Sequence, residues 1–81
     1  PTYSYIRKYD IKETNIYHID LYRIVDIDEL LFQEIEELTM EPNSILIIEW
    51  ADKLQQKLNV PSLEINFKYL SENEREIIIN N

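Results

Sequence analysis

Three polar side chains alternate along the segment Tyr17–Ile24, and their types could do chemistry. His18, Asp20 and Tyr22 occupy every second position in an otherwise largely apolar stretch. Residues two apart in a strand lie on the same face, so these three would share one surface with a carboxylate at its centre. An edge strand with one face in water gives the same pattern, and the segment alone fits both interpretations.

A second carboxylate, Glu49, ends the short apolar run Ile45–Ile48. A continuous apolar run is typical of a strand covered on both faces, so we expect this run in the interior of the sheet. A helix is expected between it and Tyr17–Ile24, and a strand–helix–strand unit makes a right-handed parallel crossover. Ligands of open α/β sheets bind at the carboxyl ends of parallel strands. The sequence therefore predicts that Asp20 and Glu49 converge at one rim of the sheet.

Paired carboxylates at such a rim have a defined chemistry. They can hold Mg²⁺, which prefers oxygen ligands and keeps several waters, or they can orient an attacking water. The competing interpretation is that Asp20 and Glu49 are plain surface acids, as most of the sixteen acidic residues must be. His18 has no second histidine and no cysteine with which to complete a zinc site, so we expect it to form a hydrogen bond beside Asp20.

The remaining segments complete the order β-β-α-β-α-β-β. We expect a first strand at Thr2–Tyr9, a short second helix over residues 51–61, a half-buried strand at Leu63–Tyr69 and a final antiparallel strand at Arg75–Asn80. The first helix is expected to begin at Asp26 with a capping-box-like start. Its apolar stripe has helical spacing and consists of Ile27, Leu30, Leu31, Ile35 and Leu38.

Composition limits the classes of function. The 81 residues make one small domain or part of one, and their net charge of −8 argues against broad nucleic-acid binding. The absence of cysteine excludes disulfides and thiolate metal sites, and no apolar run approaches the roughly 20 residues of a membrane span. We therefore expect a cytoplasmic location. The chain also has no glycine, so its turns must use Asn, Asp, Ser and Pro.

Several motifs together resemble the bacterial TsaE (YjeE) family, the P-loop ATPase of tRNA threonylcarbamoyladenosine biosynthesis. The resemblance lies in Pro1–Tyr3, the His-x-Asp-Leu-Tyr-Arg motif His18–Arg23, the helix start Asp26–Leu30, the strand end Ile48–Trp50, and Arg75. Order and spacing agree over essentially the whole chain. The fold that this implies is part of a P-loop NTPase-like α/β sheet with a parallel strand–helix–strand unit and a C-terminal antiparallel hairpin.

The resemblance also implies roles for single residues. Asp20 would occupy a Walker-B-like position at ATP and Mg²⁺, and Glu49 would lie at the metal and the γ-phosphate. Thr2 would belong to a switch-like segment at the cofactor, Arg75 would lie near the nucleotide, and Lys53, in the short loop after the Glu-Trp pair, would be a further cofactor-binding residue. The implied partners are the TsaB and TsaD proteins, with tRNA bound only through their assembly and no membrane involved.

One departure from the family pattern is large. The glycine-rich loop G-x-x-x-x-G-K-[ST], which holds the phosphates, cannot occur in a chain without glycine. We therefore interpret residues 1–81 as the C-terminal portion of one TsaE-like ATPase domain, without its P-loop half, and inactive alone. The alternative is a non-catalytic acidic α/β interaction module. If the P-loop half is missing, we expect an uncovered apolar edge at Tyr17–Ile24 or Ile45–Ile48, which favours self-association or unfolding.

Overall fold

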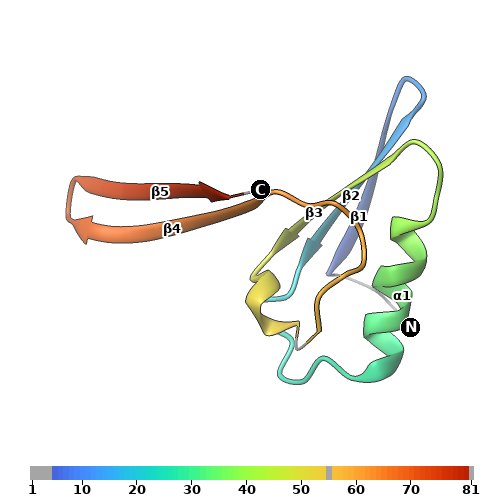
Figure 1. Ribbon diagram of the computed structural model, residues 1–81, viewed down its shortest axis with the longest axis horizontal. Coiled ribbons are helices and arrows are strands. Elements are labelled where there is room, and N and C mark those ends of the chain that lie inside the picture. The colour runs from blue at the N-terminus through green and yellow to red at the C-terminus, as the bar shows by residue number, and fades with distance from the viewer. Residues whose placement is uncertain (1–4, 55, 81) are drawn as a thin grey trace.

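A three-stranded mixed sheet forms the centre of the fold in the computed structural model, which describes residues 5–54 and 56–80 (Figure 1). Strand β1 (Ile6–Ile11) pairs antiparallel with β2 (Thr14–Asp20), and β2 pairs parallel with β3 (Ser44–Glu49). The order is β1-β2-β3. The expected parallel pairing is confirmed, but the interior position expected for Ile45–Ile48 is wrong, because β3 is an edge strand among the described residues.

Helix α1 (Glu29–Thr39) connects the two parallel strands and packs on one face of the sheet. Its N-cap is Asp28, whose Oδ1 accepts a hydrogen bond from the Leu31 amide at 2.8 Å, so the helix begins later than the Asp26 start expected from sequence. Between this helix and the sheet lies the apolar core. Its buried members are Tyr17, Ile19, Leu21, Leu31, Phe32 and Ile35.

The opposite face of the sheet is open. Side chains alternate along a strand, so Ile45 and Ile47 lie on the face away from α1, and each is 52% exposed. Tyr9, on the same face of β1, is also exposed. No described segment packs over this face, which explains why the apolar run of β3 is covered on one side only.

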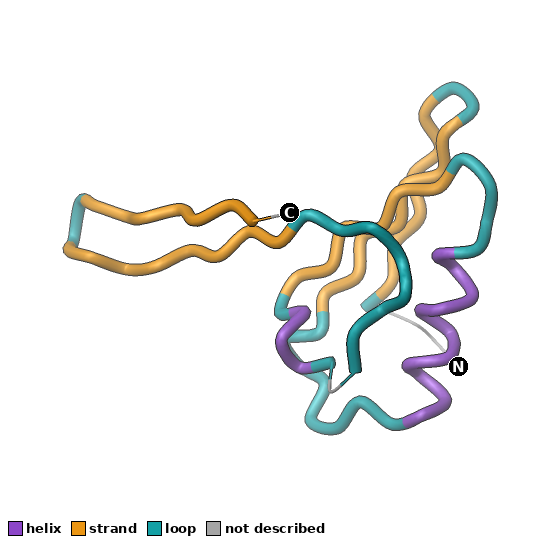
Figure 2. Tube along the Cα trace, viewed as in Figure 1, coloured by secondary structure: helices purple, strands orange, loops and turns teal. Residues whose placement is uncertain are grey.

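A 3₁₀ turn, η1 (Ala51–Lys53), replaces most of the helix expected over residues 51–61. Isolated helices this short are marginal, and Pro61 limits their extension. The loop that follows still contributes to the core, because Leu54 and Leu58 pack against it as partly buried side chains. Figure 2 shows this loop leading from η1 to the last two strands.

The last two strands form a hairpin that extends away from the sheet (Figures 1 and 2). Strand β4 (Glu64–Ser71) pairs antiparallel with β5 (Glu74–Asn80), which confirms the expected hairpin. The expected half-burial of Leu63–Tyr69 is wrong: Phe67 is 72% exposed, since no described segment covers either face of the hairpin.

Strand limits and turns also differ from the sequence-based expectations. The strands expected at Thr2–Tyr9 and Tyr17–Ile24 are found as β1 and β2, shifted toward Ile6–Ile11 and Thr14–Asp20, and Tyr22 falls in the loop after β2. Among the described residues, three that are not glycine have left-handed backbones, namely Lys12, Asn43 and Trp50. Asparagine tolerates this conformation, whereas lysine and tryptophan are unusual there. Within the described ranges, no helix is long and apolar enough to cross a membrane.

Candidate functional site

Asp20 and Glu49 lie directly opposite each other at the carboxyl ends of β2 and β3. The parallel register pairs their Cα atoms, so both side chains point to the same face of the sheet. Their neighbours Ile19 and Ile48 pack in the core under α1, which places the two carboxylates on the open face. Both residues are exposed. The two acids singled out by sequence are thus adjacent at one rim.

Backbone hydrogen bonds fix the end of β2 beside the end of β3. The Leu21 amide donates to the Glu49 carbonyl at 3.2 Å, and the Asp20 amide donates to the Tyr5 carbonyl at 2.9 Å. Asp20 Oδ1 accepts a hydrogen bond from the Tyr22 amide at 3.0 Å, an Asx-type turn that orients the carboxylate.

Glu49 is oriented by His18. The His18 Nε2 and Glu49 Oε2 atoms are 2.5 Å apart, and both side chains are partly in solvent, at 37% and 51% exposed. The hydrogen bond that the sequence predicted for His18, beside Asp20, is therefore present, and its partner is Glu49 on the adjacent strand. The register accounts for this, because His18 is paired with Ile47 and Glu49 lies diagonally across.

Two carboxylate oxygens at this rim could serve a metal ion. Asp20 engages Oδ1 and Glu49 engages Oε2, and the other oxygen of each has no hydrogen bond to the described part of the chain. Mg²⁺ is commonly held by one or two carboxylates, with water and phosphate oxygens completing the octahedron. Residues 5–54 and 56–80 contain no group of three or more His, Cys, Asp or Glu side chains that could hold a metal ion. The two carboxylates could each offer an oxygen to a metal ion that keeps water or phosphate ligands, but they do not form an all-protein cage.

The other residues singled out by sequence divide by position. Lys53 lies at the rim, where Nζ donates to the Tyr22 carbonyl at 2.6 Å and to the Ile24 carbonyl at 3.0 Å. Arg75 lies beside the hairpin turn, at the end of the hairpin farthest from the sheet (Figure 1), and Nη1 donates to the Ser71 carbonyl at 2.6 Å. Thr2 lies outside the described residues. The structure therefore brings Lys53, but not Arg75, to Asp20 and Glu49.

Trp50 is a feature of the rim whose geometry the sequence did not predict. It follows Glu49 directly and has left-handed backbone angles, φ 61° and ψ 40°. Its ring lies 5.0 Å from that of Tyr22, centroid to centroid. The chain changes direction abruptly between β3 and η1, a place where glycine is the usual residue. The sequence signal for this geometry is therefore a turn after Glu49 that contains no glycine.

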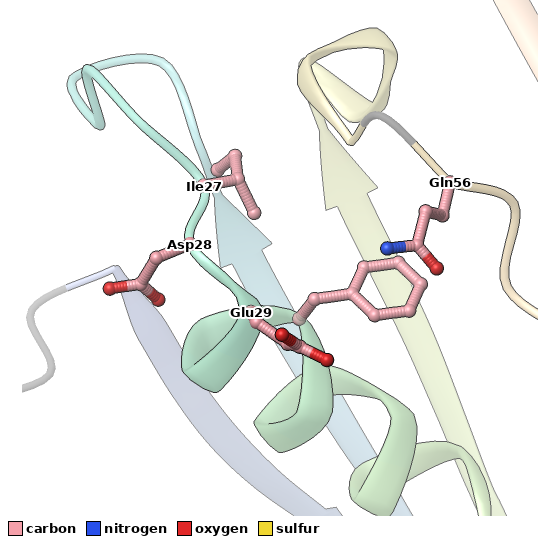
Figure 3. Close-up of a pocket in the computed structure, with 5 residues that line it drawn as sticks. Ile27, Asp28, Glu29 and Gln56 are labelled. Carbon is pink, nitrogen blue, oxygen red and sulfur yellow. The ribbon is translucent and has the colours of Figure 1, made fainter.

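A hollow on the helix side of the sheet is separate from these carboxylates. Its lining residues come from the start of α1 and the later loop, and Figure 3 draws them as Ile27, Asp28, Glu29, Phe32 and Gln56. On the same side, Tyr17 Oη donates to Glu41 Oε1 at 2.7 Å. That hydrogen bond, followed by burial and the charge of Glu41, raises the pKa of Tyr17 above its usual value. Neither feature reaches the open face.

Comparison with known proteins decides the family. The family model described as "Threonylcarbamoyl adenosine biosynthesis protein TsaE" matches residues 1–77. The chain belongs to the TsaE family. Its α/β fold, with a parallel strand pair and a C-terminal hairpin, is the class expected from the sequence resemblance to TsaE.

Individual TsaE proteins show how much of such a protein is present. The chain is 39% identical over 69 residues to the tRNA threonylcarbamoyladenosine biosynthesis protein TsaE of Haemophilus influenzae, covering 85% of this chain and 43% of that protein. The Rickettsia prowazekii protein of the same name is 33% identical over 75 residues, or 93% of this chain and 51% of that protein. The Bacillus subtilis protein of the same name is 30% identical over 81 residues, which cover 95% of this chain and 47% of that protein. The chain thus spans about half the length of the curated relatives it matches.

Proposed function

We propose that this chain is the C-terminal portion of a TsaE-type ATPase domain and supplies Asp20 and Glu49 to its Mg-ATP site. The observation that carries the proposal is the direct pairing of these two residues at the carboxyl ends of adjacent parallel strands. Family membership supports it independently of that geometry. The ATPase would act in the cytoplasm with TsaB and TsaD in forming threonylcarbamoyladenosine at adenosine 37 of tRNA.

The roles of the rim residues follow from their contacts. Asp20 is held by the Tyr22 amide through Oδ1, so its second oxygen is available to a metal ion. Glu49 is held by His18 through Oε2, and its second oxygen can bind the metal ion or accept a hydrogen bond from an attacking water. Bound Mg²⁺ would supply positive charge to the phosphates. Lys53 already bonds two carbonyls, so we assign it no phosphate contact.

The second candidate is a non-catalytic acidic interaction module, which the absence of glycine from the sequence favours. The chain exposes 7085 Å², whereas a folded monomer of this mass, 9.8 kDa, exposes about 5200 Å², and under either candidate another polypeptide segment would cover the difference. Phosphoryl transfer also depends on a phosphate-binding loop, and no glycine-rich loop exists in these 81 residues. An interaction module needs neither that loop nor a metal ion.

A phosphate-release assay separates the two candidates. The 81-residue chain is compared with a chimera in which the part of Bacillus subtilis TsaE that this chain does not span is joined ahead of Pro1. We expect no Mg²⁺-dependent phosphate release from the chain alone and clear release from the chimera. Glu49→Ala should abolish release by the chimera, while Glu76→Gln, a charge change on the exposed β5 strand, should not.

Two results would contradict the proposal. Turnover by the short chain that Glu49→Ala abolishes would mean that the catalytic machinery is misplaced. A chimera that hydrolyses ATP equally well with Glu49→Ala and Asp20→Asn would exclude a role for the rim and favour the interaction module.

A further inference from the structure

A group of four residues connects the segments that follow the two carboxylates. We call this group, Tyr22, Ile24, Trp50 and Lys53, the rim clamp. Tyr22 and Ile24 belong to the loop after β2, whereas Trp50 and Lys53 belong to the η1 turn after β3. The two loops are about thirty positions apart in sequence. Both lie past the last paired residues of β2 and β3, so contacts within the clamp hold them together where the strands no longer do.

Lys53 makes the polar contacts of the clamp. Its ammonium group has three donors, of which one bonds the Tyr22 carbonyl at 2.6 Å and one bonds the Ile24 carbonyl at 3.0 Å. Nζ also lies 5.8 Å from the centroid of the Tyr22 ring. Hydrogen bonds from a charged donor are stronger than neutral ones, and Lys53 as a whole is half-buried. These contacts hold the ammonium against the protein backbone.

Trp50 makes the aromatic contact of the clamp and has a strained backbone. A bulky side chain rarely adopts φ 61°, and such a residue persists only where its surroundings fix it. Two contacts do so here: the Tyr22 ring lies at 5.0 Å, and the Lys53 amide donates to the Trp50 carbonyl at 3.0 Å. The strained residue directly follows Glu49, so the clamp determines the direction in which β3 ends.

We propose that Lys53 is a positioning residue whose bonds to the Tyr22 and Ile24 carbonyls hold the ends of β2 and β3 together and keep Asp20 and Glu49 in place. This differs from the nucleotide contact that the sequence resemblance suggested for Lys53. The part that concerns Mg²⁺ rests on the proposed function, whereas the structural part does not. Lys53 touches neither carboxylate, so it acts through the backbone that carries them.

The sole tryptophan of the chain provides a direct measurement, because Trp50 is itself part of the clamp. We compare wild type, Lys53→Met, Lys53→Arg and the matched control Lys57→Met, which removes the same charge from an exposed position of the following loop. Each 81-residue variant is examined without nucleotide by Trp50 emission, acrylamide quenching and far-ultraviolet circular dichroism. Mg²⁺ affinity is measured separately by calorimetric titration.

Lys53→Met should shift Trp50 emission to longer wavelength and increase quenching, with circular dichroism unchanged. Its Mg²⁺ affinity should fall about tenfold, the lower end of what a lost supporting contact costs a metal site. Lys57→Met should behave as wild type, and Lys53→Arg should recover most of the Trp50 signature. The quenching result decides the structural role whether or not the wild-type chain binds Mg²⁺ without nucleotide, and the phosphate-release assay on the chimera decides the proposed function.

Three outcomes would overturn the positioning role. Unchanged emission and quenching in Lys53→Met would show that Trp50 does not depend on the lysine. Weaker ATP binding in the chimera with an unchanged Trp50 signature would instead identify Lys53 as a phosphate contact. If Lys53→Met and Lys53→Arg both lost their circular dichroism while Lys57→Met kept it, position 53 would serve general packing.

Discussion

Replacing Asp20 with asparagine should stabilise the protein in the absence of metal and destabilise it, relative to wild type, in the presence of Mg²⁺. Asp20 and Glu49 are paired in register and carry like charges on one face. Asparagine keeps the side-chain oxygen that accepts the Tyr22 amide, so the turn after β2 is preserved. The substitution therefore removes mainly the repulsion between the two carboxylates and the ability to share a cation.

The magnitude follows from the spacing of the strands. Neighbouring strands lie roughly 5 Å apart, and two unit charges at that distance in water repel by about 0.8 kcal/mol. Because both residues are exposed, we use this value for water, which is the smallest that the repulsion energy can take. Removing the repulsion should therefore raise the melting temperature by about 3–6 °C for a domain of this size. Mg²⁺ at ten times its Kd would stabilise wild type by about 1.4 kcal/mol, a gain that Asp20→Asn should lose.

The assay is urea unfolding followed by Trp50 fluorescence, in EDTA and in Mg²⁺, with Asp26→Asn as a control in an exposed loop. Glu49→Gln also loses its charged bond to His18, so a double-mutant cycle with Asp20→Asn isolates the coupling between the carboxylates. A cycle without coupling, or equal Mg²⁺ stabilisation of wild type and Asp20→Asn, would refute the shared site.

Three further predictions concern the rest of the molecule. Ile35→Ala should cost about 2–5 kcal/mol of unfolding free energy, a large part of the total for a domain of this size. Leu30→Ala, on the exposed side of the same helix, should cost under about 0.5 kcal/mol, and equal losses would contradict the core assignment. The raised pKa of Tyr17 stabilises the fold fully below its unfolded pKa of about 10, so the advantage of wild type over Tyr17→Phe should shrink as the pH rises above 10 in denaturation experiments; a constant difference would refute it. Phe67→Lys should increase the monomer fraction in sedimentation equilibrium more than Asn66→Lys on the other face of β4, and the reverse order would place the association surface elsewhere.

The part of the site predicted from sequence depended on patterns with strong physical rules. A strand–helix–strand unit makes its strands parallel, and this rule placed Asp20 and Glu49 at one rim. The period-3.6 stripe predicted α1, of which Leu31 and Ile35 are indeed buried. Local hydrogen bonding decided the helix start: the sequence predicted Asp26, whereas it is the Asp28 side chain that accepts the Leu31 amide.

The parts that sequence did not predict depend on contacts between distant segments. Alternation in Leu63–Tyr69 predicts a face to be buried but does not say that another segment is present to bury it, and β4 is exposed on both faces. Nothing local to Lys53 indicates that its ammonium reaches carbonyls about thirty positions earlier. The left-handed backbone of Trp50 likewise depends on Tyr22, a residue of another segment.

The two faces of the central sheet have different consequences for the candidate site. On one face, Ile19 and Ile48 pack beneath α1, and this packing fixes the strands that carry Asp20 and Glu49. On the other face, Glu49 follows the exposed side chains Ile45 and Ile47 along the same side of β3. A polypeptide that buries those two isoleucines therefore lies next to Glu49. Burial of this face would also lower the local dielectric around the carboxylates, which strengthens their interaction with any cation. A segment that covered Ile45 and Ile47 would therefore also change the surroundings of Glu49.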